Sequence, residues 1–133
     1  MKYKVFTDGA SLGNPGEAGC GFVVKDESGK TIYEGAKSLG VSTNNVAEYF
    51  GLISAAEYVK TLNPQFVEFF LDSELVVKQI KGEYKVKNSF LLQLWSRAVE
   101  LLRDIDHTIS HIPREKNIEA DFLSKKAAMM NKK

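Results

Sequence analysis

The hydrophobic pattern of the chain changes its period once, and this change constrains the fold more than any other feature. Strand patterns come first, over residues 2–8, 18–26 and 31–38, joined by short links that contain Gly. Consecutive strands with short links predict an antiparallel meander. From residue 45 apolar side chains recur at helical spacing, which predicts a helix over residues 45–60.

The remainder of the chain alternates strand and helix patterns. Residues 66–72 carry apolar side chains at both odd and even positions, which is typical of an interior strand covered on both faces. Helix patterns over 73–80 and 89–103 and a strand pattern over 106–112 follow. Asn117 is then expected to cap a last helix over 117–128. A meander followed by such units predicts an α/β fold with one mixed sheet and helices on both faces.

Length and composition favour a single intracellular domain. A chain of 133 residues fits one domain, which we expect over residues 1–128, followed by a short basic tail over 129–133. No apolar run approaches the about 20 residues that span a bilayer, and no signal-peptide stretch precedes the first strand. The single cysteine, Cys20, cannot form an internal disulfide, so we expect a cytoplasmic protein without a membrane partner. The net charge of +1 excludes a strongly basic domain, so polyanion binding requires local patches.

Four carboxylates occupy positions where packing does not call for an acid. They are Asp8, Glu48, Asp72 and Asp121. Asp8 and Asp72 end strand patterns, and adjacent parallel strands would bring them together at the sheet edge where α/β folds bind ligands. Glu48 continues an apolar helical stripe, and Asp121 opens the last helix. Because buried acids repel one another and lose hydration, a chain that gathers them needs a cation, and carboxylate oxygens select Mg²⁺ or Mn²⁺.

Each acid also has an explanation that needs no metal. Asp8 and Asp72 precede Gly9 and Ser73, and an Asp after a strand commonly forms a turn. An acid in the first turn of a helix is favoured by the helix dipole, which applies to Glu48 and Asp121. Each of these explanations accounts for its acid alone, so the motifs around the acids have to decide.

The segments around the four acids resemble the motifs of type 1 ribonuclease H. They are Thr7-Asp8-Gly9-Ala10-Ser11 with Gly13-Asn14-Pro15-Gly16, Thr43-Asn44-Asn45-Val46-Ala47-Glu48, Leu71-Asp72-Ser73-Glu74, and Asn117-Ile118-Glu119-Ala120-Asp121. All occur in the family's order, over essentially the whole chain. The resemblance implies a ribonuclease H-like fold, with three antiparallel strands and then two parallel strands in one five-stranded sheet flanked by helices. It also implies an endonuclease that cuts the RNA strand of RNA–DNA hybrids.

The resemblance further implies that the four acids bind two Mg²⁺ ions, with Mn²⁺ as a substitute. Two metals about 3.5–4 Å apart can clamp an in-line displacement at phosphorus. One activates the attacking water and the other stabilises the leaving 3′ oxygen, so the products would carry 5′-phosphate and 3′-hydroxyl ends. We expect Asp8 to be the ligand shared by both metals.

Recognition of the RNA strand requires groups that read 2′-hydroxyls in a shallow minor groove. The Gly-rich segment with Gly9, Ala10 and Ser11 lets the backbone approach the hybrid closely. The resemblance implies that Asn14, Asn44 and Asn45 also contact the hybrid, because they match family positions that do so. Cap and turn chemistry explains Asn44 and Asn45 equally well, and one residue can serve both purposes. Glu74 stands where the family often has Gln, which argues against a side-chain contact at that position.

The basic helix that many bacterial members insert before the helix at 89–103 is absent, as in the shorter, archaeal-like form of the family. A smaller basic patch remains beside Tyr84, and we expect it to contact backbone phosphates; its members are Lys78, Lys81, Lys85 and Lys87. A solvated surface explains these lysines equally well.

Two residues compete for the role of an auxiliary catalytic group. His111 precedes Asp121 by ten residues, which is the spacing of a mobile histidine in bacterial members. The following Pro113-Arg114-Glu115 resembles the archaeal-like and plant-like pattern instead, and there the Arg114 position lies beside the site. The sequence supports both assignments.

Two other functions have to be weighed against hybrid cleavage. A nuclease of the same superfamily could cut DNA junctions or duplex RNA; the motifs at residues 8–11 and 44–48 disfavour the junction enzymes and leave duplex RNA as a second substrate. A binding module without catalysis would lack at least one acid, and all four are present. We therefore expect a monomeric nuclease whose partner is an RNA–DNA hybrid.

Overall fold

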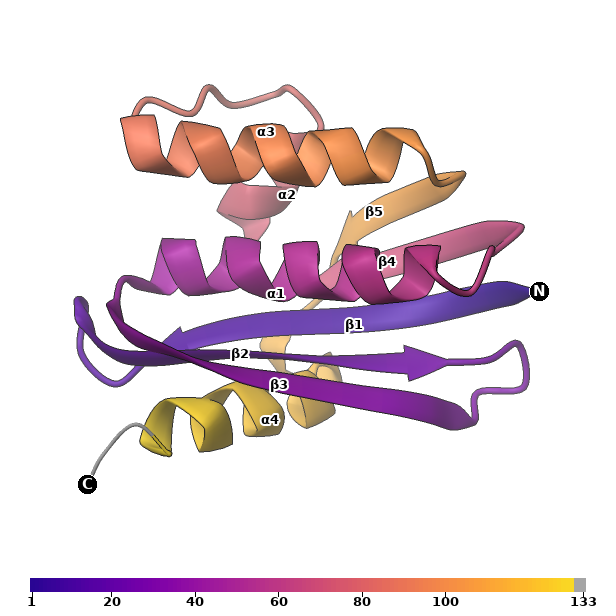
Figure 1. Ribbon diagram of the computed structural model, residues 1–133, viewed down its shortest axis with the longest axis horizontal. Coiled ribbons are helices and arrows are strands. Elements are labelled where there is room, and N and C mark those ends of the chain that lie inside the picture. Colours follow the sequence, from indigo (N-terminus) through magenta and orange to yellow (C-terminus); the bar gives the residue numbers. More distant parts are fainter. Residues whose placement is uncertain (131–133) are drawn as a thin grey trace.

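A computed structural model describes residues 1–130 and places them around one five-stranded sheet (Figure 1). The elements in chain order are β1 (Lys2–Ser11), β2 (Gly16–Lys25), β3 (Thr31–Ser42), α1 (Asn44–Lys60), β4 (Phe66–Leu71), α2 (Glu74–Ile80), α3 (Ser89–Arg103), β5 (His107–His111), the 3-10 helix η1 (Arg114–Lys116) and α4 (Ile118–Met129). The strand order is β3-β2-β1-β4-β5. β1 and β2 are antiparallel, as are β2 and β3, whereas β4 is parallel to β1 and β5. The predicted mixed sheet is confirmed.

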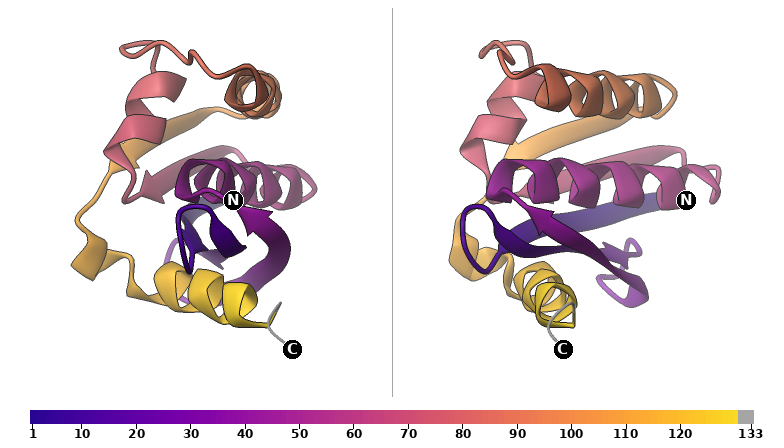
Figure 2. Two further views of the ribbon diagram at one scale, coloured as in Figure 1. Left: turned by 90° about the vertical axis from the view of Figure 1, so that its left-hand side faces the viewer. Right: turned by 60° about the vertical axis from the view of Figure 1, so that its left-hand side comes forward.

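Helices cover both faces of the sheet (Figure 2). α1 packs against β1 and β2 on one face, and α3 packs against α1. α4 packs against β2, β1 and β3 on the opposite face. The main apolar core lies between α1, α3 and the sheet, and its largest fully buried apolar side chains include Tyr49, Phe69, Leu52 and Leu71. Because α1 lies between the sheet and α3, most of its circumference is buried.

Helix α1 begins one residue before its predicted start and orients Glu48 inward. The Oγ1 atom of Thr43 accepts a hydrogen bond from the N–H of Val46 at 3.3 Å, which satisfies one of the unpaired N–H groups of the first turn. Along the helix, Leu52 and Val59 are fully buried, and Glu48 on the same stripe is 8% exposed. The predicted continuation of the apolar stripe by an acid is therefore confirmed.

Strand β1 is longer than the sequence pattern predicts. Residues from Gly9 to Ser11 were expected to open a loop, yet they pair with β2 as far as the Ser11–Ala18 pair. β4 ends at Leu71, opposite Thr7. Asp8 consequently lies inside β1, immediately beyond the last pair with β4, rather than at the end of a strand. Pairing with a long neighbouring strand overrides the loop preference of Gly here.

The C-terminal end also differs slightly from expectation. The predicted tail over 129–133 begins inside the last turn of α4, because Met129 is still helical. Residues 131–133 lie outside the described part of the chain. No helix within residues 1–130 is both long and apolar enough to cross a membrane.

Two glycines let α1 lie directly on β1. A Cβ atom added to Gly9 would lie 2.1 Å from the carbonyl carbon of Ala47. A Cβ atom added to Gly51 would lie 2.6 Å from the backbone oxygen of Asp8. The backbones therefore meet without intervening side chains, and this contact fixes the height of Glu48 above the strand.

We predict that Gly51→Ala destabilises the protein, although Ala is the better helix former. Higher helix propensity contributes at most about 1 kcal/mol, whereas forcing a methyl group against the Asp8 backbone costs about 1–3 kcal/mol. Urea unfolding measures the difference. Ser96→Ala, at an exposed position of α3, is the control and should leave stability unchanged or slightly raised. A more stable Gly51→Ala variant would contradict the described contact.

Candidate active site

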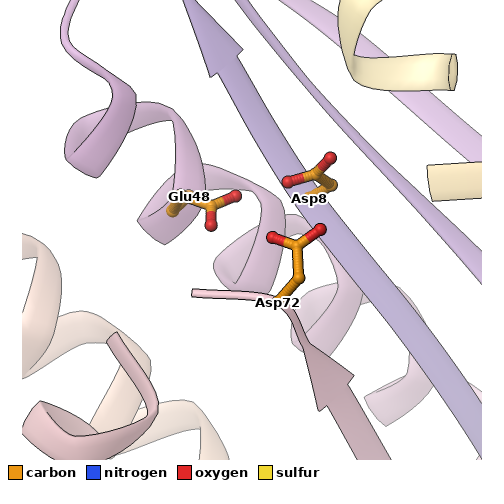
Figure 3. A group of neighbouring side chains, drawn as sticks. All are labelled: Asp8, Glu48 and Asp72. Atoms are coloured by element: carbon orange, nitrogen blue, oxygen red, sulfur yellow. The ribbon is translucent and has the colours of Figure 1, made fainter. Parts of the chain in front are cut away.

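Three carboxylates from three different elements point toward one another (Figure 3). Asp8 extends from β1, Glu48 from α1, and Asp72 follows the last residue of β4. One carboxylate oxygen from each lies within 4.8 Å of those from the other two. The predicted side-by-side placement of Asp8 and Asp72 thus follows from the parallel pairing of β1 with β4. We call these three residues the carboxylate group.

Backbone and side-chain donors hold the carboxylate group in place. The N–H of Gly9 donates to Oδ1 of Asp8 at 2.9 Å and also to Oε1 of Glu48. The hydroxyl of Ser124, on α4, donates to Oδ2 of Asp8 at 3.4 Å. Because β4 ends before Gly9, the Gly9 N–H is available for carboxylates. The carboxylate group therefore forms where β4 ends, around the Gly9 N–H.

Asn117 has a different role from the one predicted. The sequence indicates a helix cap, but the Asn117 side chain makes no cap hydrogen bond to α4. Its Nδ2 donates to the backbone oxygen of Thr7 at 2.8 Å and to Oδ2 of Asp72 at 3.2 Å. Asn117 is 1% exposed, so it joins α4, β1 and Asp72 inside the protein. Sequence reasoning missed this contact because no local pattern encodes a partner so distant in the chain.

Burial and mutual repulsion favour protonated acids in the metal-free site. Burial raises the pKa of Asp8 to about 7; the hydrogen bond with Glu48 opposes this rise, and the charge of Asp72 adds to it. Burial also raises the pKa of Glu48 well above its ordinary value, with Asp8 as the next cause. A divalent cation among these oxygens would favour the ionised forms. The hard oxygen donors and their separation fit such an ion.

The fourth predicted acid, Asp121, lies beside the carboxylate group and is paired with two cations. Its side chain is 21% exposed and lines the same cavity. Lys125 Nζ lies 3.1 Å from Oδ2, and Arg114 Nη2 lies 3.8 Å from Oδ1. Lys125 was not predicted as a site residue, although its position four residues after Asp121 in a helix was a usable signal.

An open cavity of about 450 Å³ exposes the four acids. Among the predicted site residues, its lining includes Gly9, Ala10, Ser11, Asn44, Asn45 and Arg114. His111 ends β5, is exposed and is not part of this lining. Lys85 and Lys87 are exposed on the link between α2 and α3, away from the cavity.

Asn14 and Asn44 join the turn after β1 to the start of α1. The Oδ1 atom of Asn44 accepts from the N–H of Ser11 at 2.9 Å. The Oδ1 atom of Asn14 accepts from the N–H of Asn44 at 3.1 Å. Asn14 lines a neighbouring hollow with Thr43 and Asn45 rather than the cavity of the acids. These asparagines have a structural role, and their part in binding stays a prediction.

Comparisons with known proteins agree with this fold and site. The sequence model of the reverse transcriptase-like family matches residues 6–127. Ribonuclease HI of Halobacterium salinarum is 40% identical over 123 residues, which cover 92% of this chain and 62% of the relative. The bifunctional protein Rv2228c of Mycobacterium tuberculosis is 40% identical over 131 residues, which cover 96% of this chain and 35% of that protein. The chain thus spans less than two thirds of each of these relatives.

Solved structures show the same similarity in three dimensions. The crystal structure of the Halobacterium salinarum RNase H1 superposes with a TM-score of 0.92 at 38% identity, covering 96% of this chain and 97% of that one. LC11-RNase H1, solved in complex with an RNA/DNA hybrid, has a TM-score of 0.91 at 38% identity and covers 97% of this chain and 98% of its own. The sheet order and the carboxylate group define a ribonuclease H-like domain. The chain belongs to the type 1 ribonuclease H family.

We predict that Asp8→Asn stabilises the metal-free protein at pH 8. Asp8 ionises near its ordinary pKa of 3.8 when unfolded but near 7 when folded. Between these values the folded protein binds more protons, so stability falls as pH rises through this window. Removal of the charge should recover on the order of 1–3 kcal/mol at pH 8 and much less at pH 4.

Chemical unfolding in EDTA at the two pH values checks this expectation. Asp106→Asn, at an exposed position before β5, is the control for loss of one negative charge. Equal changes in the free energy of unfolding for the two substitutions would show that the Asp8 charge does not destabilise the folded protein.

Proposed function

We propose that the protein is an endoribonuclease that hydrolyses the RNA strand of RNA–DNA hybrids. The observation that carries this proposal is the convergence of Asp8, Glu48 and Asp72 at an open cavity, in a member of the type 1 ribonuclease H family. The complex of LC11-RNase H1 with an RNA/DNA hybrid supports the choice of substrate. The products would carry 5′-phosphate and 3′-hydroxyl ends.

The carboxylate group, with Asp121, would hold two Mg²⁺ ions, or Mn²⁺ in their place. When bound, the ions would supply activation of a water molecule and neutralisation of charge on the scissile phosphate. Glu48, Asp72 and Asp121 all act on the pKa of Asp8, so Asp8 is the acid best placed to serve both ions. Asp8 and Glu48 would lose their protons on metal binding, because the cation opposes the burial that raises each pKa.

The remaining cavity residues would bind and orient the hybrid. Backbone groups of Gly9 to Ser11 and the side amides of Asn44 and Asn45 line the cavity and offer donors and acceptors to 2′-hydroxyls. Asn117 keeps the Asp72 carboxylate turned toward the site through its 3.2 Å hydrogen bond. Arg114, which lines the cavity, is better placed than His111 to meet a phosphate there.

We also propose that the protein acts as a monomer in the cytoplasm. The free, buried Cys20 fits a reducing compartment.

We predict that Asp8→Asn reduces cleavage of a labelled RNA–DNA hybrid to the level of an EDTA control, while hybrid binding measured by fluorescence anisotropy persists. The amide keeps the shape of the side chain but removes the charge that a metal needs. The assay includes duplex DNA and duplex RNA as alternative substrates, with Mg²⁺ and Mn²⁺. Wild-type turnover by the variant, or equal cleavage of duplex DNA by the wild type, would refute the proposed function.

We predict that Lys85→Gln and Lys87→Gln each lower the salt dependence of hybrid binding. One lost phosphate contact reduces the slope of log affinity against log salt by about 1. Both lysines are exposed and have room to reach a backbone outside the cavity. Lys30→Gln, in the exposed turn between β2 and β3, is the matched control. Slopes equal to that of Lys30→Gln would mean that these lysines only solvate the surface.

A further inference from the structure

The Asp121 carboxylate differs from the other three acids in its surroundings. Asp8, Glu48 and Asp72 have hydrogen-bond donors or one another as neighbours, and no cationic side chain is paired with them among residues 1–130. Asp121 instead has Lys125 at 3.1 Å and the more distant Arg114 at 3.8 Å. The oxygens that a metal would use on this acid are thus already engaged by positive charge.

Lys125 is held within reach of the cavity by the docking of α4. It follows Asp121 by one helical turn, so both side chains lie on the same face of the helix. That helix is pressed against β2, where a Cβ atom added to Gly19 would lie 2.4 Å from the backbone nitrogen of Ala128. Lys125 lines the cavity of the acids, whereas the adjacent Lys126 does not. The helix therefore cannot turn Lys125 away from the cavity without losing its contact with the sheet.

We propose that Lys125 is a positioning residue that acts as a built-in counter-cation, competing with a divalent ion for the Asp121 carboxylate and so setting the ion concentration at which the site fills. This inference rests on the proposed function, because it concerns the same metal site. Filling the site would require the Lys125 ammonium to release Asp121 and move into the open part of the cavity. Its side chain is 48% exposed, which leaves it room to do so.

The positive charge of Lys125 should stabilise the metal-free protein and weaken metal binding. In the metal-free state Lys125 offsets part of the repulsion among four neighbouring acids, so its removal should lower stability. In the loaded state Lys125 adds a positive charge beside the ion, so its removal should tighten metal binding. A lysine that only contacted substrate phosphates would change hybrid binding and leave metal affinity in the absence of nucleic acid unchanged.

The test compares Lys125→Gln with Lys126→Gln, which removes the same charge from the next position of the same helix. Calorimetric titration with Mn²⁺, without nucleic acid at pH 8, measures affinity independently of catalysis. A unit positive charge about 8 Å from a divalent ion in a watery site is worth a factor of about three to ten in affinity. We expect Lys125→Gln to bind Mn²⁺ more tightly by that factor, and Lys126→Gln to match the wild type. Lys125→Arg should also remain near the wild type.

Two further measurements separate the possible failures. The thermal midpoint in EDTA should fall for Lys125→Gln and not for Lys126→Gln, and circular dichroism verifies that each variant is folded. Unchanged or weaker Mn²⁺ binding by folded Lys125→Gln would overturn the inference while leaving the proposed function intact, provided the wild type binds Mn²⁺ and cleaves the hybrid. Failure of the wild type to bind Mn²⁺ would overturn both. Loss of hybrid affinity with unchanged Mn²⁺ affinity would assign Lys125 to phosphate binding and also overturn the inference.

Discussion

The contact between α1 and β1 determines where the acids of this protein can lie. Gly51 allows the helix to lie against the backbone of Asp8, and Gly9 allows the strand to lie against Ala47. At that separation Glu48 reaches the N–H of Gly9, which would otherwise face the space beyond the end of β4. A side chain at either glycine would lift the helix and withdraw Glu48 from Asp8. The close approach of the α1 and β1 backbones therefore brings Glu48 to Asp8 and forms the carboxylate group.

The same arrangement buries neighbouring acids, so that their ionised forms are unfavourable unless a cation is bound nearby. Burial raises the pKa of Asp8 and of Glu48, so the empty site favours bound protons. Asp121, which is less buried, is neutralised by Lys125 and, at a greater distance, by Arg114. Protons, basic side chains and divalent ions thus compete for one set of oxygens. A site that binds hard cations is accordingly one whose empty form is less stable than its packing alone would give.

Local patterns were sufficient for the architecture and for the inward position of Glu48, because periodicity determines which side of a helix meets the core. The placement of Asp8 beside Asp72 was predicted on the condition that their strands are adjacent and parallel, and the pairing of β1 with β4 meets that condition. The extent of β1 did not follow, because Gly-rich sequence favours a loop until a partner strand is present. Asn117 illustrates a further limit. Its side chain donates a hydrogen bond to Thr7, which lies more than a hundred positions earlier in the chain, whereas the local sequence indicates only a helix cap. The placement of Arg114 and Lys125 beside Asp121 could not be predicted without knowing how α4 docks on the sheet.

The order of the elements along the chain has a consequence for biosynthesis. β1, the central strand of the sheet, precedes the other described elements along the chain, and α4 follows them. A nascent chain that has not yet released α4 holds Asp8, Glu48 and Asp72 but lacks Asp121, and it also lacks the helix that covers the far side of β2. All four acids are therefore brought together only after α4 has been synthesised and has docked against β2.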